Sequence, residues 1–417
     1  MYHKVILENG LRVVAERLPA VKSVSLGIWV DVGSRDEEPG EAGYSHFIEH
    51  MFFKGTRKRS AARISREIDA LGGELNAFTS RETTTFYVKV LDQHLEQAVD
   101  LLADLFHHSR FAADDIEREK QVVLEEIRMV QDDPEDYVQE MHQAQAMPDH
   151  PLGRSILGHA GTIQGIRRDR LLRYVGRHYH PSRIVLSVAG NFDWIPLRRR
   201  LARAFGTFTR PNPVPPPRSP AEIGRGVQVT RKALEQVHVC LGLKGVSATH
   251  RDRYAVSALN AVLGGGVSSR LFQEVREKRG LAYSIYSYPS SYSDAGTLTV
   301  YAGTRRREAA RVVDLVCREI KRLRRDGLSR AELAHTKNQL KGNLMLGLEN
   351  SQSRMSKLAK DELLYGRHCS LDEMLKEIDR VTAGQVLRIG RELLDVDRLA
   401  VTVLGPIGRE AIAAAVP

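Results

Sequence analysis

The spacing of hydrophobic residues along the 417-residue chain alternates between the two-residue period of strands and the longer period of amphipathic helices. Amphipathic helices are predicted over residues 60–71, 92–107 and 114–131. Runs of β-branched and aromatic residues predict strands over residues 24–32 and 183–191, and two more, joined by a polar turn, within residues 74–90. This mixture predicts a fold of the α+β class.

A proline-rich stretch divides the chain near its middle. Residues 211–222 contain so many prolines that neither a helix nor a central strand is expected there, and a semi-rigid extended linker is predicted instead. The linker would separate an N-terminal domain, residues 1–210, from a C-terminal domain, residues 223–417.

The most informative motif is His46-Phe47-Ile48-Glu49-His50, on a short predicted helix that ends at Gly55. His46 and His50 are four residues apart, so both imidazoles lie on one face, and such a nitrogen pair suits zinc. Glu49 leans over the same face, where it is suited to take a proton from a water molecule rather than to bind the metal. The alternative is an ordinary buried helix with two hydrogen-bonded histidines, so the metal interpretation needs a third ligand.

Candidates for the third ligand lie on the helix predicted over residues 114–131. Glu119 and Glu126 are seven residues apart, which places them on one face two turns apart. Acidic residues on a helix are usually solvated, but two histidines and one carboxylate form the expected ligand set of a catalytic zinc site.

The second half of the chain repeats the first in outline, which indicates an internal duplication. At an offset of 217 residues, Glu119 corresponds to Thr336 and Glu126 to Asn343. Only the first copy carries candidate metal residues, which favours a functional role for them. The predicted elements of the second copy are strands at 236–241, 282–290 and 295–303, a helix that ends at Gly264, and helices at 268–278, 306–325 and from 328 onward.

The composition predicts an intracellular protein without a membrane span. The chain has no apolar run of about 18 residues or more, and its first residues lack the features of a signal peptide. Cys240, Cys317 and Cys369 are odd in number and widely spaced, which predicts reduced structural thiols and a cytoplasmic location.

The net charge of +10 raises the alternative of a nucleic-acid or acidic-ligand binder. The excess is spread over the second half, however, and residues 101–150 carry 4 basic and 13 acidic residues. The basic runs at 57–59 and 305–307 lack interleaved aromatic residues for base stacking. A solvated basic surface is the better interpretation, and no nucleic-acid partner is expected.

In their order and spacing, the motifs resemble those of the pitrilysin or insulinase (M16) family of zinc metallopeptidases, specifically the smaller members similar to the mitochondrial processing peptidase β-subunit. The His-x-x-Glu-His order is the inverse of the commoner zinc motif. The resemblance covers nearly the whole chain and is carried by residues 9–13, 46–50, 76–79, 119–126 and 271–283.

The resemblance implies a metal site with defined roles. His46, His50 and Glu126 would bind one zinc ion per chain and leave a fourth position open. Glu49 would be the general base, and Glu119 would orient the site from behind the ligands.

The resemblance also implies residues that hold the substrate. Asn76, Ala77 and Phe78 would form an edge strand on which an extended peptide lies by β-augmentation. Arg276 and Tyr283 match a pair that reaches the substrate and stabilises the oxyanion. From the residues alone, a salt-bridged surface arginine and a packed strand tyrosine are the alternatives.

The family builds a clamshell-like chamber from four such α/β units, and this chain supplies two of them. The resemblance therefore implies a dimer, with a homodimer favoured over a heterodimer. Arg276 and Tyr283 would act either within their own chain or on the partner's zinc site. The expected activity is a zinc-dependent endopeptidase for extended or unfolded peptides. The acidic block at 101–150 would favour basic, presequence-like peptides. The main alternative is a non-catalytic assembly subunit on the same fold, which the complete set of zinc-site residues disfavours.

Overall fold

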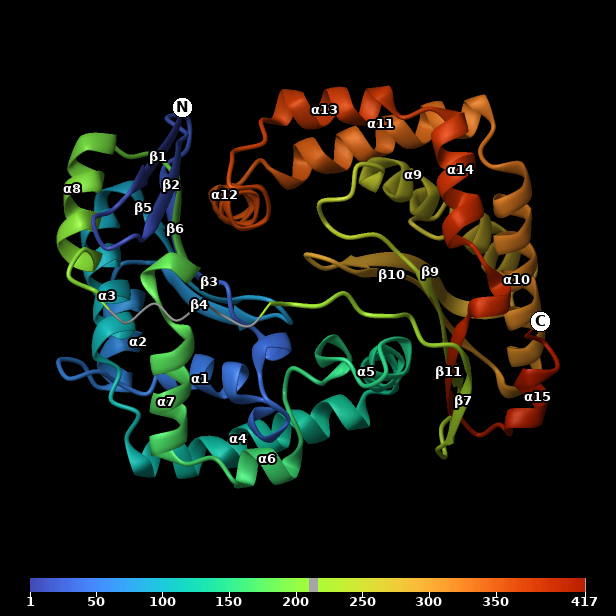
Figure 1. The fold of residues 1–417 in the computed structure, drawn as a ribbon, viewed down its shortest axis with the longest axis horizontal. Helices are drawn as coiled ribbons and strands as arrows, with labels where there is room; N and C mark the ends of the chain where they lie inside the picture. Colours follow the sequence, from blue (N-terminus) through green and yellow to red (C-terminus); the bar gives the residue numbers. More distant parts are fainter. Residues whose placement is uncertain (210–216, 417) are drawn as a thin grey trace. The chain divides into compact units, whose positions relative to one another are not determined.

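The structure is a computed structural model that describes residues 1–209 and 217–416, and it contains two compact units. Each unit combines one β-sheet with several helices, so the predicted α+β class is confirmed (Figure 1). Unit 1 consists of the described residues of Met1–Arg128, Arg154–Pro217 and Leu346–His368, and unit 2 of those of Met129–Gly153, Arg218–Met345 and Cys369–Pro417.

Each unit includes one helical segment that comes from the other half of the sequence. The compact units therefore differ from the predicted linear domains, 1–210 and 223–417, at residues 129–153 and 346–368. The difference arises because these segments bury their apolar side chains against the sheet of the other half. The predicted linker at 211–222 falls mostly outside the described residues, and its described part from 217 to 222 forms neither helix nor strand.

Unit 1 is built on a six-stranded sheet with the order β1-β2-β6-β3-β5-β4. All neighbouring strands are antiparallel except β2 and β6. The predicted strands are confirmed as β3, the β4–β5 hairpin and β6, and β4 lies at the edge of the sheet. The strands are β1 (Tyr2–Ile6), β2 (Arg12–Arg17), β3 (Ser23–Val30), β4 (Glu74–Thr79), β5 (Thr84–Leu91) and β6 (Ile184–Gly190).

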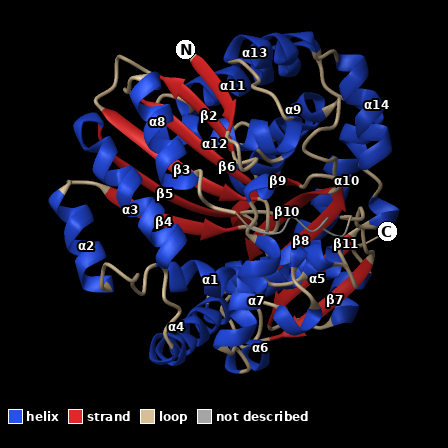
Figure 2. Ribbon diagram, turned by 60° about the vertical axis from the view of Figure 1, so that its left-hand side comes forward, coloured by secondary structure: helices blue, strands red, loops and turns tan. Residues whose placement is uncertain are grey.

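Helices cover both faces of this sheet. One face shares the main hydrophobic core of the unit with most of its helices, of which α3 and α8 are seen beside the strands in Figure 2. These helices are α1 (Tyr44–Phe52), α2 (Ala61–Ala70), α3 (Leu95–His108), α4 (Ala113–Asp132), α6 (Ala160–Gln164), α7 (Arg168–His178) and α8 (Trp194–Phe205).

In the described part of the chain, the opposite face packs against α12 (Ser351–Tyr365), which contributes Met355 and Leu358 to a cluster around Trp29. Gly27 permits this close approach, because a Cβ atom there would lie 2.4 Å from the sulfur of Met355.

Unit 2 contains a five-stranded sheet with the order β7-β11-β8-β10-β9. Residues 272–277 form a π-helical turn within the region predicted as an ordinary helix. None of the described helices in either unit is long and apolar enough to cross a bilayer. The strands are β7 (Gly226–Arg231), β8 (Val237–Lys244), β9 (Ala282–Ser291), β10 (Gly296–Thr304) and β11 (Ala400–Gly405), and the helices are α5 (Pro134–Ala146), α9 (Arg253–Leu263), α10 (Ala309–Asp326), α11 (Arg330–Gly347), α13 (Leu371–Arg380), α14 (Ala383–Leu393) and α15 (Arg409–Ala413).

Candidate metal centre

Helix α1, which carries the paired histidines, is anchored by its apolar face. Phe47, Ile48 and Met51 are fully buried in the core of unit 1. The helical period therefore turns the two histidines and the intervening glutamate toward the opposite, partly exposed side. The local sequence fixes both the helix and the direction in which its polar residues point.

A buried carboxylate caps the beginning of α1. The two side-chain oxygens of Glu37 accept hydrogen bonds from the backbone amides of Gly43 (2.9 Å) and Ser45 (2.7 Å). Burial raises the pKa of Glu37 to about 8, although the two amides favour its ionised form. The sequence interpretation missed this residue, because it is one of several acids in a polar loop and its partners depend on the tertiary fold.

Replacing Glu37 with Ala is expected to destabilise α1, because two buried amides would lose their acceptors at about 1–3 kcal/mol each. The midpoint of thermal unfolding should fall, and amide hydrogen exchange at residues 43–47 should accelerate. Glu38→Ala is the matched control, since the side chain of Glu38 is 68% exposed. Equal behaviour of the two variants would contradict a capping role.

Three potential ligand atoms converge where α4 runs beside α1 (Figure 1). The Nε2 atoms of His46 and His50 are 3.2 Å apart, and Oε2 of Glu126 is 3.6 Å from each of them. Among the described residues, no other group of three or more histidine, cysteine or acidic side chains comes together in this way.

These separations match the dimensions of a zinc site. Two ligands about 2.0–2.2 Å from a zinc ion at tetrahedral angles lie about 3.3–3.6 Å from each other. The side chains of His46 and His50 are only 12% and 16% exposed, while that of Glu126 is 34% exposed. Two neutral nitrogens and one carboxylate oxygen, brought together in a half-buried position, therefore fit a zinc ion both in donor chemistry and in spacing.

Glu119 orients His50 from the side away from the cluster. Its carboxylate is 2.8 Å from Nδ1 of His50 and 2.6 Å from the ammonium group of Lys54, and the residue is only 3% exposed. With Nδ1 donating to Glu119, the lone pair of Nε2 points toward His46 and Glu126. Lys54 was not identified from the sequence, because a single lysine after a helix carries no distinctive signal.

The two histidines differ in their electrostatic surroundings. Burial lowers the pKa of His46 to about 3, and its Nδ1 atom is buried with no hydrogen-bond partner among the described residues. Burial also lowers the pKa of His50, but the hydrogen bond that Nδ1 donates to Glu119 and the nearby carboxylates outweigh it and give a net increase. Hydrogen bonds to His50 and Lys54 keep the pKa of Glu119 below its usual value despite its burial.

Glu49 lies beside the cluster but is held by a different partner. Its Oε2 atom accepts a hydrogen bond of 2.5 Å from the hydroxyl group of Thr79, at the end of β4. Burial raises the pKa of Glu49, and this hydrogen bond opposes the increase. The contact with Thr79 joins the metal helix to the edge strand, and the sequence interpretation did not anticipate it.

The predicted substrate strand lies directly beside α1. Asn76, Ala77 and Phe78 belong to β4, which pairs with β5 on one side and with no other strand among the described residues. Exposure alternates along β4, as expected for an edge strand with two different faces. The free edge offers unpaired backbone groups to an extended peptide.

Arg276 and Tyr283 lie together in unit 2. The guanidinium group of Arg276 is 4.8 Å from the ring centre of Phe272 and 5.0 Å from that of Tyr283, so it stacks between two aromatic rings. Tyr283 is 78% exposed and, with Arg276, lines a cavity of about 470 Å³. The structure thus brings this pair together within unit 2, and the remaining predicted site residues together within unit 1.

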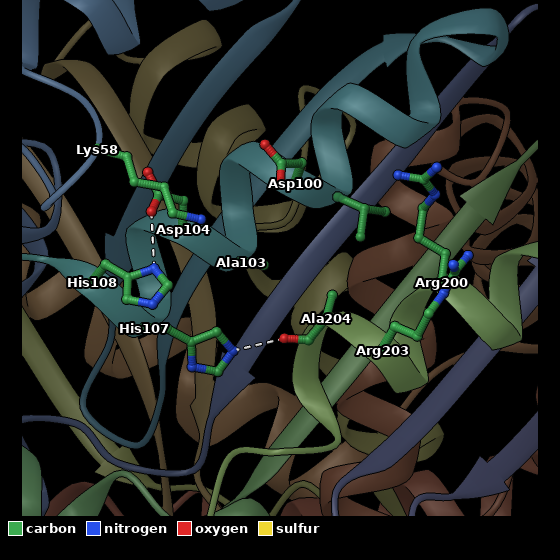
Figure 3. A pocket seen from close by; sticks show the side chains of 10 residues that line it. Lys58, Asp100, Ala103, Asp104, His107, His108, Arg200, Arg203 and Ala204 are labelled. Carbon is green, nitrogen blue, oxygen red and sulfur yellow. Dashed lines mark hydrogen bonds and ion pairs between the residues drawn. The ribbon is translucent and has the colours of Figure 1, made fainter.

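A separate cavity of about 340 Å³ in unit 1 contains two further histidines, between α3 and α8 (Figure 3). His107 donates from Nε2 to the carbonyl oxygen of Ala204, and His108 is bonded through Nδ1 to Asp104. Because these side chains do not converge with a third ligand, the cavity lacks the metal-binding geometry found at α1 and α4.

Cations on the same helix neutralise much of the acidic charge of α4. Each of three acidic residues pairs with a lysine or arginine three positions further along α4; these are Asp115, Glu117 and Glu125. A fourth, Glu119, pairs with Lys54, which lies outside α4. Because Arg118, Lys120 and Arg128 are already among the 4 basic residues counted at 101–150, these ion pairs leave the acidic excess of that block as counted, and only Lys54 comes from outside it.

Comparisons with known proteins agree with this architecture. Residues 12–160 match the family profile described as insulinase (peptidase family M16), and residues 165–340 match the profile described as peptidase M16 inactive domain. A solved structure of a protease from Helicobacter pylori superposes with a TM-score of 0.91 at 24% identity and covers 97% of this chain and 99% of that chain. At this identity, the likeness supports the fold alone.

Sequence relatives extend the likeness to nearly the full length. The chain is 42% identical over 408 residues to a Bacillus subtilis protein named "Uncharacterized zinc protease YmxG", with 98% of this chain and 99% of the relative covered. It is 44% identical over 409 residues to a Mycobacterium tuberculosis protein also named as an uncharacterized zinc protease, with 97% of this chain and 93% of the relative covered. The chain belongs to the insulinase family of M16 peptidases.

Proposed function

We propose that this chain is a zinc-dependent endopeptidase of the inverted His-x-x-Glu-His type that hydrolyses extended peptides. The observation that carries the proposal is the convergence of His46, His50 and Glu126 at distances that fit one zinc ion, with Glu49 beside them. The names of the sequence relatives support the same conclusion.

Each side chain of the candidate metal site has a distinct role in the proposed hydrolysis. A bound zinc ion would lower the pKa of a water molecule and polarise the scissile carbonyl. Glu49 takes the proton of the attacking water on its carboxylate and delivers it to the leaving amine, while Thr79 holds one carboxylate oxygen in place. Glu119 keeps His50 in the tautomer whose Nε2 lone pair points toward His46 and Glu126, where His50 would hold zinc.

The edge strand β4 provides the substrate platform. A peptide that adds to its free edge would gain main-chain hydrogen bonds, which would favour extended or unfolded segments as substrates. Arg276, whose guanidinium lies close to the rings of Phe272 and Tyr283, would present this group to a peptide carbonyl or a developing oxyanion. We further propose that the active species is a dimer of identical chains, which would complete the four-unit chamber typical of the family.

Removal of the metal is the direct test. Dialysis against a chelator is expected to abolish cleavage of a quenched fluorescent peptide, and about one equivalent of zinc per chain is expected to restore it. Magnesium, which prefers oxygen ligands, serves as the control ion. Full activity in the metal-free protein would exclude the proposal. Stable zinc binding without cleavage would favour the non-catalytic assembly subunit.

We also propose a modest preference for basic, presequence-like peptides, because residues 101–150 carry 13 acidic and 4 basic residues. Lysine- or arginine-rich peptides are expected to be cleaved only a few-fold faster than neutral ones, and less so at high salt. A peptide panel measured at two ionic strengths tests this expectation. Cleavage that is indifferent to basic residues at both ionic strengths would remove it.

A further inference from the structure

The segment that follows α1 continues the face on which the two histidines lie. The C-cap residue Phe53 keeps helical backbone angles (φ −90°, ψ −5°), and the amide of Lys54 donates a hydrogen bond to the carbonyl oxygen of Met51 (3.3 Å). Lys54 therefore comes one helical turn after His50, just as His50 comes one turn after His46. This spacing places the ammonium group of Lys54 beside helix α4.

The carboxylate of Glu119 uses its two oxygen atoms for two different partners. Oε1 accepts a hydrogen bond from Nδ1 of His50 (2.8 Å), and Oε2 lies 2.6 Å from Nζ of Lys54. Because Glu119 is only 3% exposed, little water is available to replace either partner. Lys120, the next residue along α4, pairs with Glu117 instead (2.7 Å). Lys54 is therefore the cation that holds the second oxygen of this buried carboxylate.

Two contacts fix the orientation of this carboxylate more firmly than one contact does. The terminal torsion of a glutamate side chain has broad energy minima, so a carboxylate held by one oxygen can still rotate. The ammonium group on Oε2 restricts this rotation and keeps Oε1 of Glu119 directed at Nδ1 of His50. The hydrogen bond at one ring nitrogen of a histidine sets its tautomer, so the same contact leaves the Nε2 lone pair of His50 available to a metal ion.

The two histidines differ in how their rings are held. Nδ1 of His46 is buried and has no hydrogen-bond partner among the residues that the structure describes. Nδ1 of His50 is held by Glu119, which is held in turn by Lys54. Any control that polar contacts exert on the direction of a ligand ring through Nδ1 is therefore exerted, within the described part of the chain, on His50.

We propose that Lys54 is a positioning residue of the metal site: by holding Glu119, it fixes the tautomer and direction of His50 and so raises the affinity of the site for zinc. The proposal rests on the zinc site of the proposed function and adds a residue that is not itself a ligand. The alternative is an ion pair that only offsets the buried charge of Glu119. Such a pair would affect stability but would leave the tautomer of His50 unchanged.

The test compares the zinc affinity of the wild type and Lys54→Met by competition with a chromophoric chelator, in the absence of substrate. Methionine keeps an apolar stem similar to that of lysine but has no cation. The dissociation constant for zinc is expected to rise about ten-fold, the lower end of the loss typical of residues that hold a metal ligand from behind. Lys54→Arg, which keeps a cation, should restore most of the affinity. Wild-type zinc affinity in Lys54→Met would overturn the proposal.

A double-mutant cycle shows whether Lys54 acts through Glu119. Glu119→Gln keeps a carbonyl oxygen for Nδ1 of His50 but has no charge for Lys54 to hold. Adding Lys54→Met to Glu119→Gln should therefore change zinc affinity much less than Lys54→Met does alone. The matched control is Arg118→Met, which removes an exposed cation of α4 paired with Asp115 and should bind zinc like the wild type. Equal losses for Lys54→Met in both backgrounds, or the same loss in Arg118→Met, would overturn the proposal.

A measurement on the metal-free protein separates this proposal from the endopeptidase function. Nitrogen NMR of the imidazole rings, with the signals of His50 assigned from the His50→Ala variant, reports which ring nitrogen carries the proton. The neutral ring is expected to carry it on Nδ1 in the wild type and to show both tautomers in Lys54→Met. A proton on Nε2 in the wild type, which needs no stable variant to detect, or an unchanged tautomer in Lys54→Met would overturn the proposal. Zinc affinity and tautomer that both depend on Lys54, without peptide cleavage, would support it and contradict the proposed hydrolysis.

Discussion

Replacing Glu49 with Gln is expected to lower the rate of peptide hydrolysis by on the order of 10²-fold or more. Glutamine has the shape of glutamate and can still accept the hydrogen bond from Thr79, so the site should keep its geometry. It has no carboxylate to take up and release a proton. Because Glu49 is not one of the three converging ligand residues, zinc content should stay at about one ion per chain.

The measurement pairs zinc content with hydrolysis of a quenched peptide for wild type and Glu49→Gln prepared in parallel. A matched control is Glu96→Gln, which changes an exposed glutamate on α3 that pairs with Arg200. The control should match the wild type in both readouts. If Glu49→Gln retained more than about a tenth of the activity, the proton would have to be carried by another group.

Replacing His50 with Ala is expected to remove zinc and activity together. The variant loses one of the three converging ligand atoms, and Lys54 is then the charged partner of Glu119 that remains among the described residues. Without the metal, hydrolysis should fall on the order of 10³-fold or more, because the polarising charge at the carbonyl is lost.

Zinc analysis after gel filtration and the same peptide assay test this expectation. His108→Ala is the control, since His108 is bonded to Asp104 and lies outside the converging cluster. The control protein should hold zinc and cleave normally. Retention of a full equivalent of zinc by His50→Ala would show that the ligand set assigned here is incorrect.

The parts of the site that could be predicted from the sequence are those fixed by local periodicity. The four-residue spacing of His46 and His50 on a helix, and the seven-residue spacing of Glu119 and Glu126, follow from one geometric rule. The structure places three of these four side chains within 4.8 Å of one another as potential ligands, with Glu119 behind His50. The hairpin of β4 and β5 was likewise recognisable from its residue types.

The contacts that could not be predicted join residues far apart in the sequence. Glu37 caps α1 across a loop, Thr79 reaches Glu49 from a strand 30 residues later, and Lys54 meets Glu119. Each depends on how elements pack, which local hydrophobic patterns do not determine. The proline-rich segment divides the sequence near its midpoint, but the compact units are defined by which apolar faces pack together. Helix α12 belongs to the second half of the sequence and packs on the sheet of the first half.

Helix α12 comes from the second half of the sequence but packs on the sheet of the first half, which affects how the protein folds during synthesis. The last strand of the unit 1 sheet, β6, ends at Gly190, whereas α12 ends at Tyr365, roughly 175 residues later. At about 5–20 residues per second, the ribosome needs roughly 10–35 s to supply the missing helix. During that interval Trp29, Val14 and Val185 remain uncovered on the nascent sheet. This apolar face of the first half is therefore expected to stay exposed to solvent until the second half is nearly complete.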